Sequence, residues 1–325
     1  MFTLLYPGQG SQQPGMGRYL YDQFRIAKDT FEEGSDALGI DMKKLCFEGS
    51  ETDLALTENT QPALLLVSTA TQRVIREEFP IKIQSAAGHS IGEYAALVSS
   101  HVLPFSSAMK AVRIRGQAMQ AAVPVGQGGM VAVMGLDPVQ VSELCQYVVQ
   151  ESKLGPLSPA NYNSPGQIVI SGSQKAIDWM KENVTAEKIW GDDGPKRMKL
   201  IPLQVSAPFH CEMMKPAEDK MRQVLSDIPF QKAEFPILQN YTADFHTEAH
   251  ELKENLIRQV SAPVLWMQSM EKLKQRNWLN CIECGTGKVI QGLLKKIDGE
   301  AFKVLSTNSI DDLKLIESAV KGWQI

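Results

Sequence analysis

The chain has 325 residues, of which 43% are hydrophobic and 22% charged, and its formal net charge is −4. This composition is ordinary for a soluble globular protein with one large domain or two smaller ones. Lysine and arginine form no basic arm or stripe, which argues against a protein that acts on nucleic acid. No apolar run reaches the roughly 18 to 20 residues that span a bilayer. Five cysteines in a chain of this length argue against a disulfide framework.

Strand-like apolar runs alternate with helical patterns along the first part of the chain. Residues 1–6 carry no cationic region, so they predict a buried strand rather than a signal peptide, and we expect a cytoplasmic protein. Residues 7–17 form a glycine-rich loop. The other predicted elements are a strand at 82–87 and helices at 19–37, 62–79, 93–98 and 106–122. This alternation favours a parallel α/β sheet.

A glycine-rich stretch at residues 124–129 is typical of a domain boundary. After it, the predicted elements are strands at 130–134 and 167–172 and helices at 137–149 and 174–184. Strand, helix, strand and helix over so short a segment predict a small α/β subdomain inserted into a larger domain. We expect a large domain formed by residues 1–125 and 198–325, and a small one formed by residues 126–197.

The stretch Gly88-His89-Ser90-Ile91-Gly92 fits the Gly-x-Ser-x-Gly nucleophile elbow. An elbow lifts a serine hydroxyl out of a sharp turn between a strand and a helix, and a predicted strand and helix flank this stretch. Gly88 and Gly92 suit such a turn, because only small residues fit where the helix and the strand approach each other. The motif therefore predicts that Ser90 is a nucleophile.

A serine hydroxyl needs a base to take its proton and donors for the oxyanion that forms when it attacks a carbonyl. The chain has five histidines. We favour His210 as the base, because Pro208 places it in a loop and because it lies far downstream of Ser90, as in α/β-hydrolase-like sites. A structural loop histidine is the alternative. The others are His89 beside the nucleophile, His101 after the elbow helix, and His246 and His250 in a polar segment.

Three further patterns could indicate redox chemistry, metal binding or phosphate binding. Cys281 and Cys284 form a Cys-x-x-Cys pair, but residues 279–284 also predict a buried strand and no second Cys/His pair follows. His246 and His250 have the spacing of a zincin helix, but Thr247 stands where such a helix needs glutamate. The pattern Gly8-x-Gly10 lacks a third glycine at residue 13. We therefore expect neither a metal site nor a bound cofactor.

Five motifs carry a family resemblance. In chain order they are Gly8-Gln9-Gly10-Ser11-Gln12, Gly88-His89-Ser90-Ile91-Gly92-Glu93, Arg115-Gly116 with Met119, Asn161-Tyr162-Asn163-Ser164-Pro165-Gly166-Gln167, and Pro208-Phe209-His210. Together they resemble the malonyl-CoA:acyl carrier protein transacylase family of bacterial fatty acid synthesis, over essentially the whole chain. One departure lies at residues 283–289, where Cys284 and Thr286 replace other residues of the pattern Glu-x-Gly-Pro-Gly-Lys-Val. Both replacements are compatible with the same turn.

The resemblance implies a large α/β-hydrolase-like domain with a parallel sheet and a small ferredoxin-like inserted subdomain. It also implies that Ser90 carries the acyl group as an ester between coenzyme A and the carrier's phosphopantetheine thiol. His210 would be the general base and acid, oriented by the backbone carbonyl of Gln259. The oxyanion hole would be the backbone N–H groups of Gln9 and Ile91.

The resemblance places Arg115 at the acyl pocket, and chemistry explains the choice. A malonyl group ends in a carboxylate, which a guanidinium binds through two parallel hydrogen bonds. The alternative is a solvated helix arginine. Phe209 is expected to leave little room for an α-methyl branch, which favours malonyl over methylmalonyl. Asn161 corresponds to an asparagine near the mouth between the domains, although Asn and Ser-Pro also make turns.

The leading hypothesis is therefore a malonyl transferase. The three alternatives are an acyl hydrolase, a trans-acting acyl loader of a polyketide pathway, and a catalytically inactive module that only binds acyl carrier protein. The expected partners are malonyl-CoA and acyl carrier protein, with no nucleic acid and no membrane. The family resemblance implies a monomer.

Overall fold

A computed structural model describes residues 1–195, 197–205 and 207–322. Its larger sheet has six strands in the order β10-β9-β1-β2-β7-β8. These strands are β1 (Phe2–Tyr6), β2 (Ile83–Gly88), β7 (Ile237–Gln239), β8 (Asp244–His246), β9 (Asn280–Glu283) and β10 (Lys303–Leu305). All neighbouring pairs are parallel except β7 with β8.

Helices cover both faces of this sheet, so the side chains of β1, which alternate between the faces, enter two different cores. Leu4 and Tyr6 join the larger core, whereas Leu5 joins a second core with Trp266 and Ile290. The helices of the first half are α1 (Arg18–Gln23), α2 (Arg25–Leu38), α3 (Met42–Glu48), α4 (Glu51–Ala55), α5 (Thr57–Glu78), α6 (Gly92–Ser99) and α7 (Phe105–Ala121). Those of the second half are α11 (Lys215–Ser226), α12 (Ala249–Arg258), α13 (Trp266–Gln275), α14 (Val289–Asp298) and α15 (Ile310–Gly322), with a 3-10 turn at Glu212–Met214.

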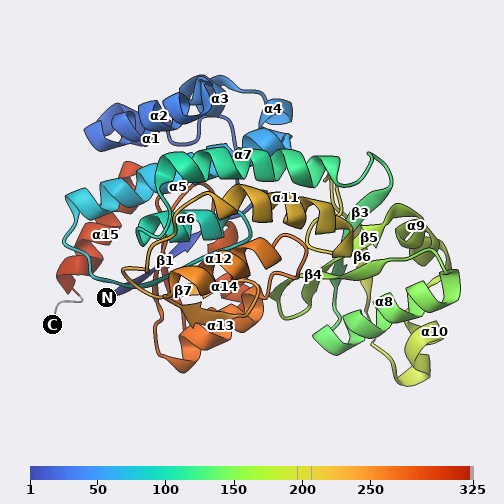
Figure 1. Cartoon of the computed structure of the whole chain (residues 1–325). Coiled ribbons are helices and arrows are strands. Elements are labelled where there is room, and N and C mark those ends of the chain that lie inside the picture. Colours follow the sequence, from blue (N-terminus) through green and yellow to red (C-terminus); the bar gives the residue numbers. More distant parts are fainter. Residues whose placement is uncertain (196, 206, 323–325) are drawn as a thin grey trace.

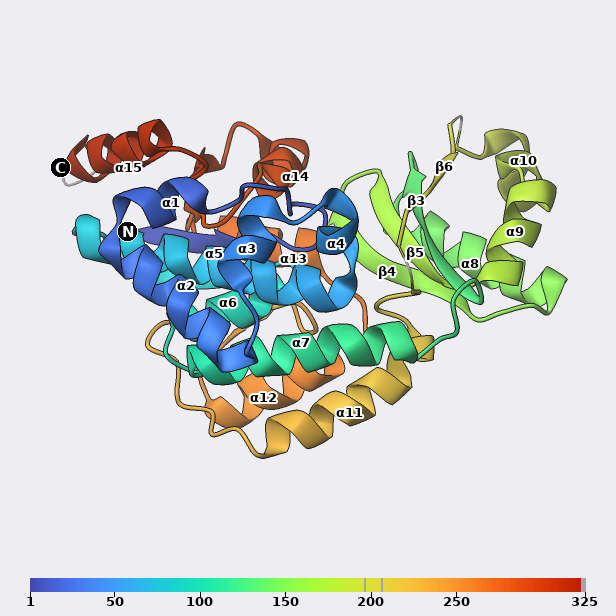
Figure 2. The same cartoon turned by 90° about the horizontal axis from the view of Figure 1, so that it is seen from above.

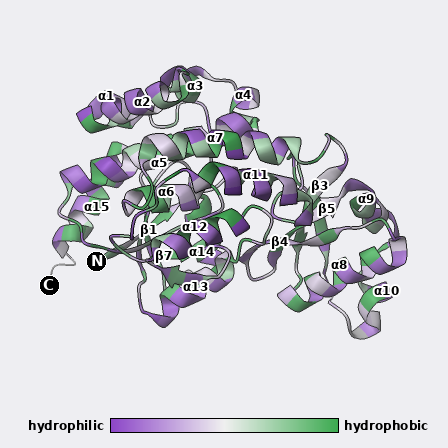
Figure 3. Ribbon diagram, in the orientation of Figure 1, coloured by the Kyte–Doolittle hydropathy of each residue, from purple (hydrophilic) through white to green (hydrophobic). Residues whose placement is uncertain are grey.

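The outer helices are amphipathic, as Figure 3 shows for α2, which carries hydrophilic and hydrophobic residues side by side. Its buried residues are Ala27, Thr30, Phe31 and Gly34, spaced three and four apart. That spacing puts them on one face of a helix, so α2 packs on the protein with one face and meets solvent with the other.

A second, smaller sheet lies at one end of the molecule (Figure 1). Its antiparallel strands are β3 (Gly128–Met134), β4 (Leu157–Ser164), β5 (Gln167–Ser173) and β6 (Lys199–Pro202), in the order β4-β5-β3-β6. Helices α8 (Pro138–Ser152), α9 (Gln174–Asn183) and α10 (Ala186–Trp190) belong to the same unit, with a 3-10 turn at Gly191–Asp193. The succession β3-α8-β4-β5-α9-β6 in this strand order is ferredoxin-like.

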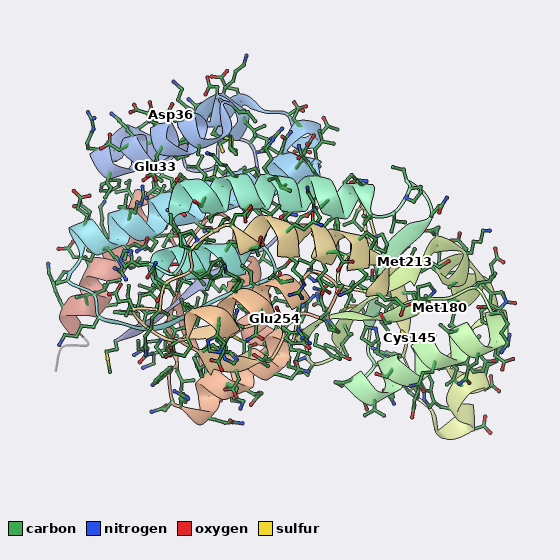
Figure 4. All side chains as sticks on the ribbon, viewed as in Figure 1. Glu33, Asp36, Cys145, Met180, Met213 and Glu254 are labelled. Atoms are coloured by element: carbon green, nitrogen blue, oxygen red, sulfur yellow. The ribbon has the colours of Figure 1, made fainter. Side chains whose placement is uncertain are left out.

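The small unit has its own core and stands beside the large one when seen from above (Figure 2). Cys145 on α8 and Met180 on α9 are part of this core (Figure 4). Strand β4 also reaches the large unit, because Tyr162 N–H donates to Val264 O at 2.9 Å and Val264 N–H donates to Ala160 O at 2.8 Å. These two bonds fix the edge of the small sheet against the loop before α13.

Several elements differ from the sequence-based expectation. The predicted helix 19–37 is two helices, because Phe24 has extended backbone angles (φ −122°, ψ 128°) between α1 and α2. The predicted helix 62–79 begins earlier, at Thr57, and Pro62 lies inside it. Proline at residue 62 cannot donate to the carbonyl of Glu58, and that carbonyl instead faces Arg113 Nη1 at 3.5 Å.

Strands β4 and β6 were not predicted. Asn161 lies in strand β4, not in a turn. Strand β6 pairs with β3 although it begins at Lys199, after the expected boundary at residue 197. We therefore propose that the small domain extends to Pro202.

Candidate active site

The nucleophile elbow joins β2 to α6 and is tightly packed. A Cβ on Gly88 would lie 1.9 Å from the carbonyl carbon of Gly92, and a Cβ on Gly92 would lie 2.3 Å from Tyr6 O. Ser90 itself has φ +52°, in the left-handed region that costs a residue with a side chain about 1–3 kcal/mol. The turn therefore exists only because both glycines let the helix and two strands meet around a strained serine.

Ser90 and His210 are hydrogen-bonded, Oγ to Nε2, at 2.8 Å. On the other side of the ring, His210 Nδ1 lies 2.9 Å from the backbone carbonyl of Gln259. A carbonyl can only accept, so Nδ1 carries the proton and Nε2 is free to accept one from Ser90. The predicted serine, histidine and backbone carbonyl are thus connected by two consecutive hydrogen bonds.

His210 is neutral over a wide pH range. Burial, together with the positive charge of Arg115, lowers the pKa of His210 to about 3, against the opposing bond from Gln259. A neutral imidazole is the form that can take a proton from a serine hydroxyl. Burial therefore keeps His210 in the protonation state that its predicted role as a base requires.

Arg115 projects from α7 into the same site and is only 1% exposed. Its Nη1 donates to Gln61 Oε1 at 2.8 Å, while Nη2 donates to Gln259 Oε1 at 2.9 Å and to Ser90 Oγ at 3.2 Å. Its Nε has no hydrogen-bond partner among the described residues. No carboxylate in the described part of the chain lies within ion-pairing distance of it. Its buried charge is therefore held by neutral amides and keeps unused donor capacity.

These side chains enclose a cavity of about 120 Å³. Its lining includes all the predicted site residues except Gln259, namely Gln9, Ser90, Ile91, Arg115, Asn161, Phe209 and His210. Methionine and aliphatic side chains, among them Met119 and Met130, complete the wall. A small, largely apolar space with one cation suits a short acyl group that ends in a charge.

The predicted oxyanion donors lie at the rim of this cavity. Neither the N–H of Gln9 nor that of Ile91 donates to an acceptor within the described residues. The N–H of Ser90, by contrast, is already bound to Asn240 Oδ1 at 2.7 Å. The N–H groups of Gln9 and Ile91 thus keep free donor capacity at the cavity, as their predicted role requires.

Other sequence candidates lie outside the site. His101, His246 and His250 do not line the cavity. Cys281 and Cys284 are free, buried thiols of β9 and the turn after it. Among residues 1–195, 197–205 and 207–322, no group of three metal-binding side chains comes together. In the same residues, no helix is long and apolar enough to cross a membrane.

Comparison with known proteins identifies the family. The acyl transferase domain model matches residues 3–291. The chain belongs to this acyl transferase family. It is 41% identical over 319 residues to the malonyl CoA-acyl carrier protein transacylase of Bacillus subtilis, covering 98% of this chain and 96% of that one. The Haemophilus influenzae transacylase of the same name is 39% identical over 317 residues, covering 97% and 98%.

Solved structures agree with this assignment. The malonyl CoA-acyl carrier protein transacylase of Clostridium perfringens superposes with a TM-score of 0.91 at 36% identity, covering 99% of this chain and 98% of that one. A malonyl-transacylase solved in complex with a type II PKS acyl-carrier protein gives 0.89 at 37% identity, with 99% of both chains covered. The predicted resemblance and the α/β fold class are confirmed, and the protein is an acyltransferase.

Sequence reasoning assigned no supporting role to the residues that hold this acyltransferase site together, although Asn163 and Glu93 lie within its family motifs. Gln61 holds the Arg115 guanidinium, and Asn240 holds the backbone of Ser90. Asn163 is hydrogen-bonded to His89 at 2.8 Å and so ties the small sheet to the elbow. Glu93, which directly follows the elbow motif, is buried and accepts from Asn240 N–H at 2.7 Å. A glutamate within the apolar stretch after Gly92 was a signal that the sequence offered, but its partner Asn240 lies far along the chain.

Proposed function

We propose that this protein transfers the malonyl group from malonyl-CoA to the phosphopantetheine thiol of acyl carrier protein, through a malonyl ester on Ser90. The observation that carries the proposal is a buried arginine that lines the same cavity as a hydrogen-bonded Ser90–His210 pair and has no carboxylate within ion-pairing distance among the described residues. The relatives' names, malonyl CoA-acyl carrier protein transacylase, support the same substrate pair. We infer that the pathway served is fatty acid synthesis.

The first half-reaction follows from the hydrogen bonds. His210 Nε2 takes the proton of Ser90 as Oγ attacks the thioester carbonyl, and the imidazolium that forms is stabilised by the Gln259 carbonyl at Nδ1. The N–H groups of Gln9 and Ile91 stabilise the oxyanion. The coenzyme A thiolate then leaves and takes the proton from His210. The carrier thiol reverses these steps, so no cofactor or metal is needed.

Arg115 sets the preference for a carboxylated acyl group. Its present acceptors are the neutral oxygens of Gln61, Gln259 and Ser90, which a malonyl carboxylate replaces with a charge-assisted pair. Phe209, in the cavity wall, restricts space next to the acyl chain. Asn161 lines the same cavity from β4, a strand of the small unit.

A second candidate is acyl loading for a polyketide pathway. One similar structure is a malonyl-transacylase bound to a type II PKS acyl-carrier protein, and the chemistry is the same. We further propose a monomer that acts in the cytoplasm. All five cysteines are free and buried, as suits a reducing compartment.

Labelling with radioactive malonyl-CoA tests the proposal. The wild-type protein should retain label on Ser90 in the absence of carrier and release it to acyl carrier protein when carrier is added. Ser90→Ala should retain none, with transfer reduced at least roughly 10³-fold. Label on the Ser90→Ala protein, or release to water at the same rate with and without carrier, would contradict malonyl transfer and favour another nucleophile or a hydrolase.

Arg115→Ala tests the substrate. We expect kcat/KM for malonyl-CoA to fall by on the order of 10²-fold, while transfer of acetyl from acetyl-CoA is unchanged or improved. Arg113→Ala, a change at the partly exposed neighbour on the same helix, is the control and should leave the malonyl/acetyl ratio as it is. An unchanged ratio in Arg115→Ala would remove this residue from acyl recognition.

A further inference from the structure

The strained backbone of Ser90 requires something to hold it. With φ +52°, Ser90 occupies a region that a residue with a side chain avoids, and the surrounding structure must over-determine it. Its carbonyl is held by Glu93 N–H of α6 at 3.0 Å and by Gln259 Nε2 at 3.1 Å. Because α6 begins at Gly92, after the serine, the helix does not hold the N–H side of Ser90, and the restraint there must come from a neighbouring element.

Asn240 supplies that restraint. Its Oδ1 accepts from Ser90 N–H at 2.7 Å, and its Nδ2 donates to Gly88 O at 2.7 Å. One carboxamide thus binds the backbone on both sides of His89, at the point where the strand turns into the elbow. Because both bonds are short and the residue is fully buried, the carboxamide fixes the turn at two points.

This pairing extends the parallel sheet by one side chain. Strands β2 and β7 pair with Ala86 opposite Ile237 and Ala87 opposite Leu238, and the chain then diverges as the elbow begins. Asn240 directly follows β7, and its side-chain amide has the same donor and acceptor as a peptide group. Its side chain therefore continues the hydrogen bonding to β2 and the elbow at the point where backbone pairing between β2 and β7 ends.

Asn240 is itself held rigidly by buried neighbours. Its N–H donates to Glu93 Oε2 at 2.7 Å, and its carbonyl accepts from Leu265 N–H at 3.0 Å. Glu93 Oε1 also accepts from Gln239 Nε2 at 3.0 Å. Because Glu93 belongs to α6, the helix after the elbow and the strand beside it are joined through one carboxylate.

We propose that Asn240 is a positioning residue for the reaction, one that sets the angle at which Ser90 Oγ meets His210. The proposal rests on the proposed role of Ser90 as the nucleophile. By occupying the N–H of Ser90, Asn240 also leaves the oxyanion to the N–H groups of Gln9 and Ile91. Its loss lets the elbow relax, so Oγ moves away from the 2.8 Å contact with Nε2.

Asn240→Ala tests this with Asn308→Ala as the matched control. Asn308 makes the same two-point pairing elsewhere, since its Oδ1 accepts from Gly287 N–H and its Nδ2 donates to Gly287 O, both at 2.7 Å, and it does not line the cavity. We expect kcat for malonyl transfer to fall on the order of 10²-fold in Asn240→Ala with KM within about twofold, as for a displacement of about 1 Å at the nucleophile. Asn308→Ala should show a similar fall in Tm and an unchanged kcat.

The pH dependence of Asn240→Asp distinguishes a loss of elbow geometry from a general loss of stability. The ionised carboxylate cannot donate to Gly88 O, whereas the protonated one reproduces both bonds. Of the ionisable groups nearby, Glu93 on α6 accepts directly from Asn240 N–H, and His89 lies between the two backbone groups that Asn240 binds. Arg115 on α7 and His210 are connected to Asn240 through hydrogen bonds with Gln259. We expect kcat of Asn240→Asp to rise several-fold as pH falls from 8 to 6, while that of the wild type and of Asn308→Ala stays flat.

The outcomes are distinct. A kcat of Asn240→Ala within threefold of that of Asn308→Ala would overturn the proposal and leave the residue a purely structural role. If Asn240→Ala does not fold, the pH profile of Asn240→Asp decides, and a profile parallel to that of the wild type overturns it. If the wild-type protein itself fails to acquire label on Ser90, the proposed function fails, whereas a labelled wild type with an unaffected Asn240→Ala contradicts this inference alone.

Discussion

Two turns at the carboxyl ends of neighbouring strands in the large sheet have the same architecture, but one has a structural role and the other presents the proposed nucleophile. Strands β2 and β9 flank β1, and each ends in a glycine-containing turn that leads into a helix, α6 or α14. Both turns pack on the end of β1, since a Cβ on Gly92 would meet Tyr6 O and one on Gly285 would meet Pro7 Cγ. Each turn also has a buried glutamate and an asparagine that pairs with its backbone.

The two turns differ in which residue adopts the left-handed backbone. After β9 it is glycine, with φ +143° at Gly285 and +82° at Gly287, so no side chain is strained. After β2 it is Ser90, at +52°. Their glutamates differ as well: Glu283 accepts from the N–H groups of Ile290 and Gln291 at the start of α14, whereas Glu93 holds Asn240. Strain is thus confined to the turn that opens into the cavity.

The largest expected effect is on the free energy of unfolding, which an alanine substitution should lower more in the turn after β2 than in the turn after β9. Gly88→Ala would place Cβ 1.9 Å from the Gly92 carbonyl carbon, a clash with backbone that cannot move aside, so we expect a loss of more than about 4 kcal/mol of unfolding free energy. Gly285→Ala meets its nearest atoms at 3.0 Å and should lose about 1–3 kcal/mol from backbone strain. Denaturant unfolding measures both.

The control for this pair is Gly292→Ala in α14. Nothing lies within 4 Å of the added Cβ, so the helix should gain about 0.5–1 kcal/mol. Equal losses for Gly88→Ala and Gly285→Ala would show that the elbow is no more crowded than its counterpart.

The second prediction compares the two buried glutamates. Glutamine at either position puts an amide NH₂ where a backbone or side-chain donor now points, which should cost about 1–3 kcal/mol in both cases. Only Glu93→Gln should also lower kcat, by about tenfold, because it loosens Asn240 and hence the nucleophile. Steady-state kinetics at saturating substrate measure this, and kcat of Glu283→Gln should stay within about twofold of the wild type. Equal kcat losses would break the contrast between a structural and a catalytic turn.

The last prediction concerns pH, because the elbow serine is hydrogen-bonded to a histidine. The pKa of His210 is about 3 in the folded protein and near 6.5 when unfolded, so between these values the unfolded state binds more protons. Stability should therefore fall by up to about 1.4 kcal/mol per pH unit below pH 6.5, and burial of His89, which also lowers its pKa, acts in the same direction. The kcat/KM for malonyl-CoA should stay level to well below pH 6.

His210→Gln provides the control for the pH dependence. Denaturant unfolding of this variant at pH 6.5 and 5.0 should give a smaller stability difference than that of the wild type. A wild-type kcat/KM that falls with an apparent pKa near 6.5 would show that the base is not protected by burial.

The strands that escaped prediction share a physical cause. Both β4 and β6 are edge strands of the small sheet, and they contain Pro159 and Pro202. Proline and asparagine are depleted from strands, but an edge strand tolerates proline because one side of it needs no ladder partner. Local propensity therefore indicated a turn around Asn161. In the structure these residues form a strand, because they pair with β5.

What the sequence determined by itself was local chemistry. The elbow needs two glycines and a serine within five residues, and these stand together in the chain, so Ser90 could be named directly. His210 could be favoured from its loop position downstream of Ser90, and the family resemblance added Arg115 and the backbone groups of Gln9, Ile91 and Gln259. All of these line the cavity except Gln259, whose carbonyl binds His210.

What only the tertiary structure decided was the support of that chemistry. Asn240 reaches the elbow from 150 residues away, through the parallel pairing of β2 with β7. Gln61 reaches Arg115 because α5 packs on α7. Side-chain amides recur throughout any sequence without a pattern of their own, so folding alone selects which of them face a strained serine and a buried guanidinium.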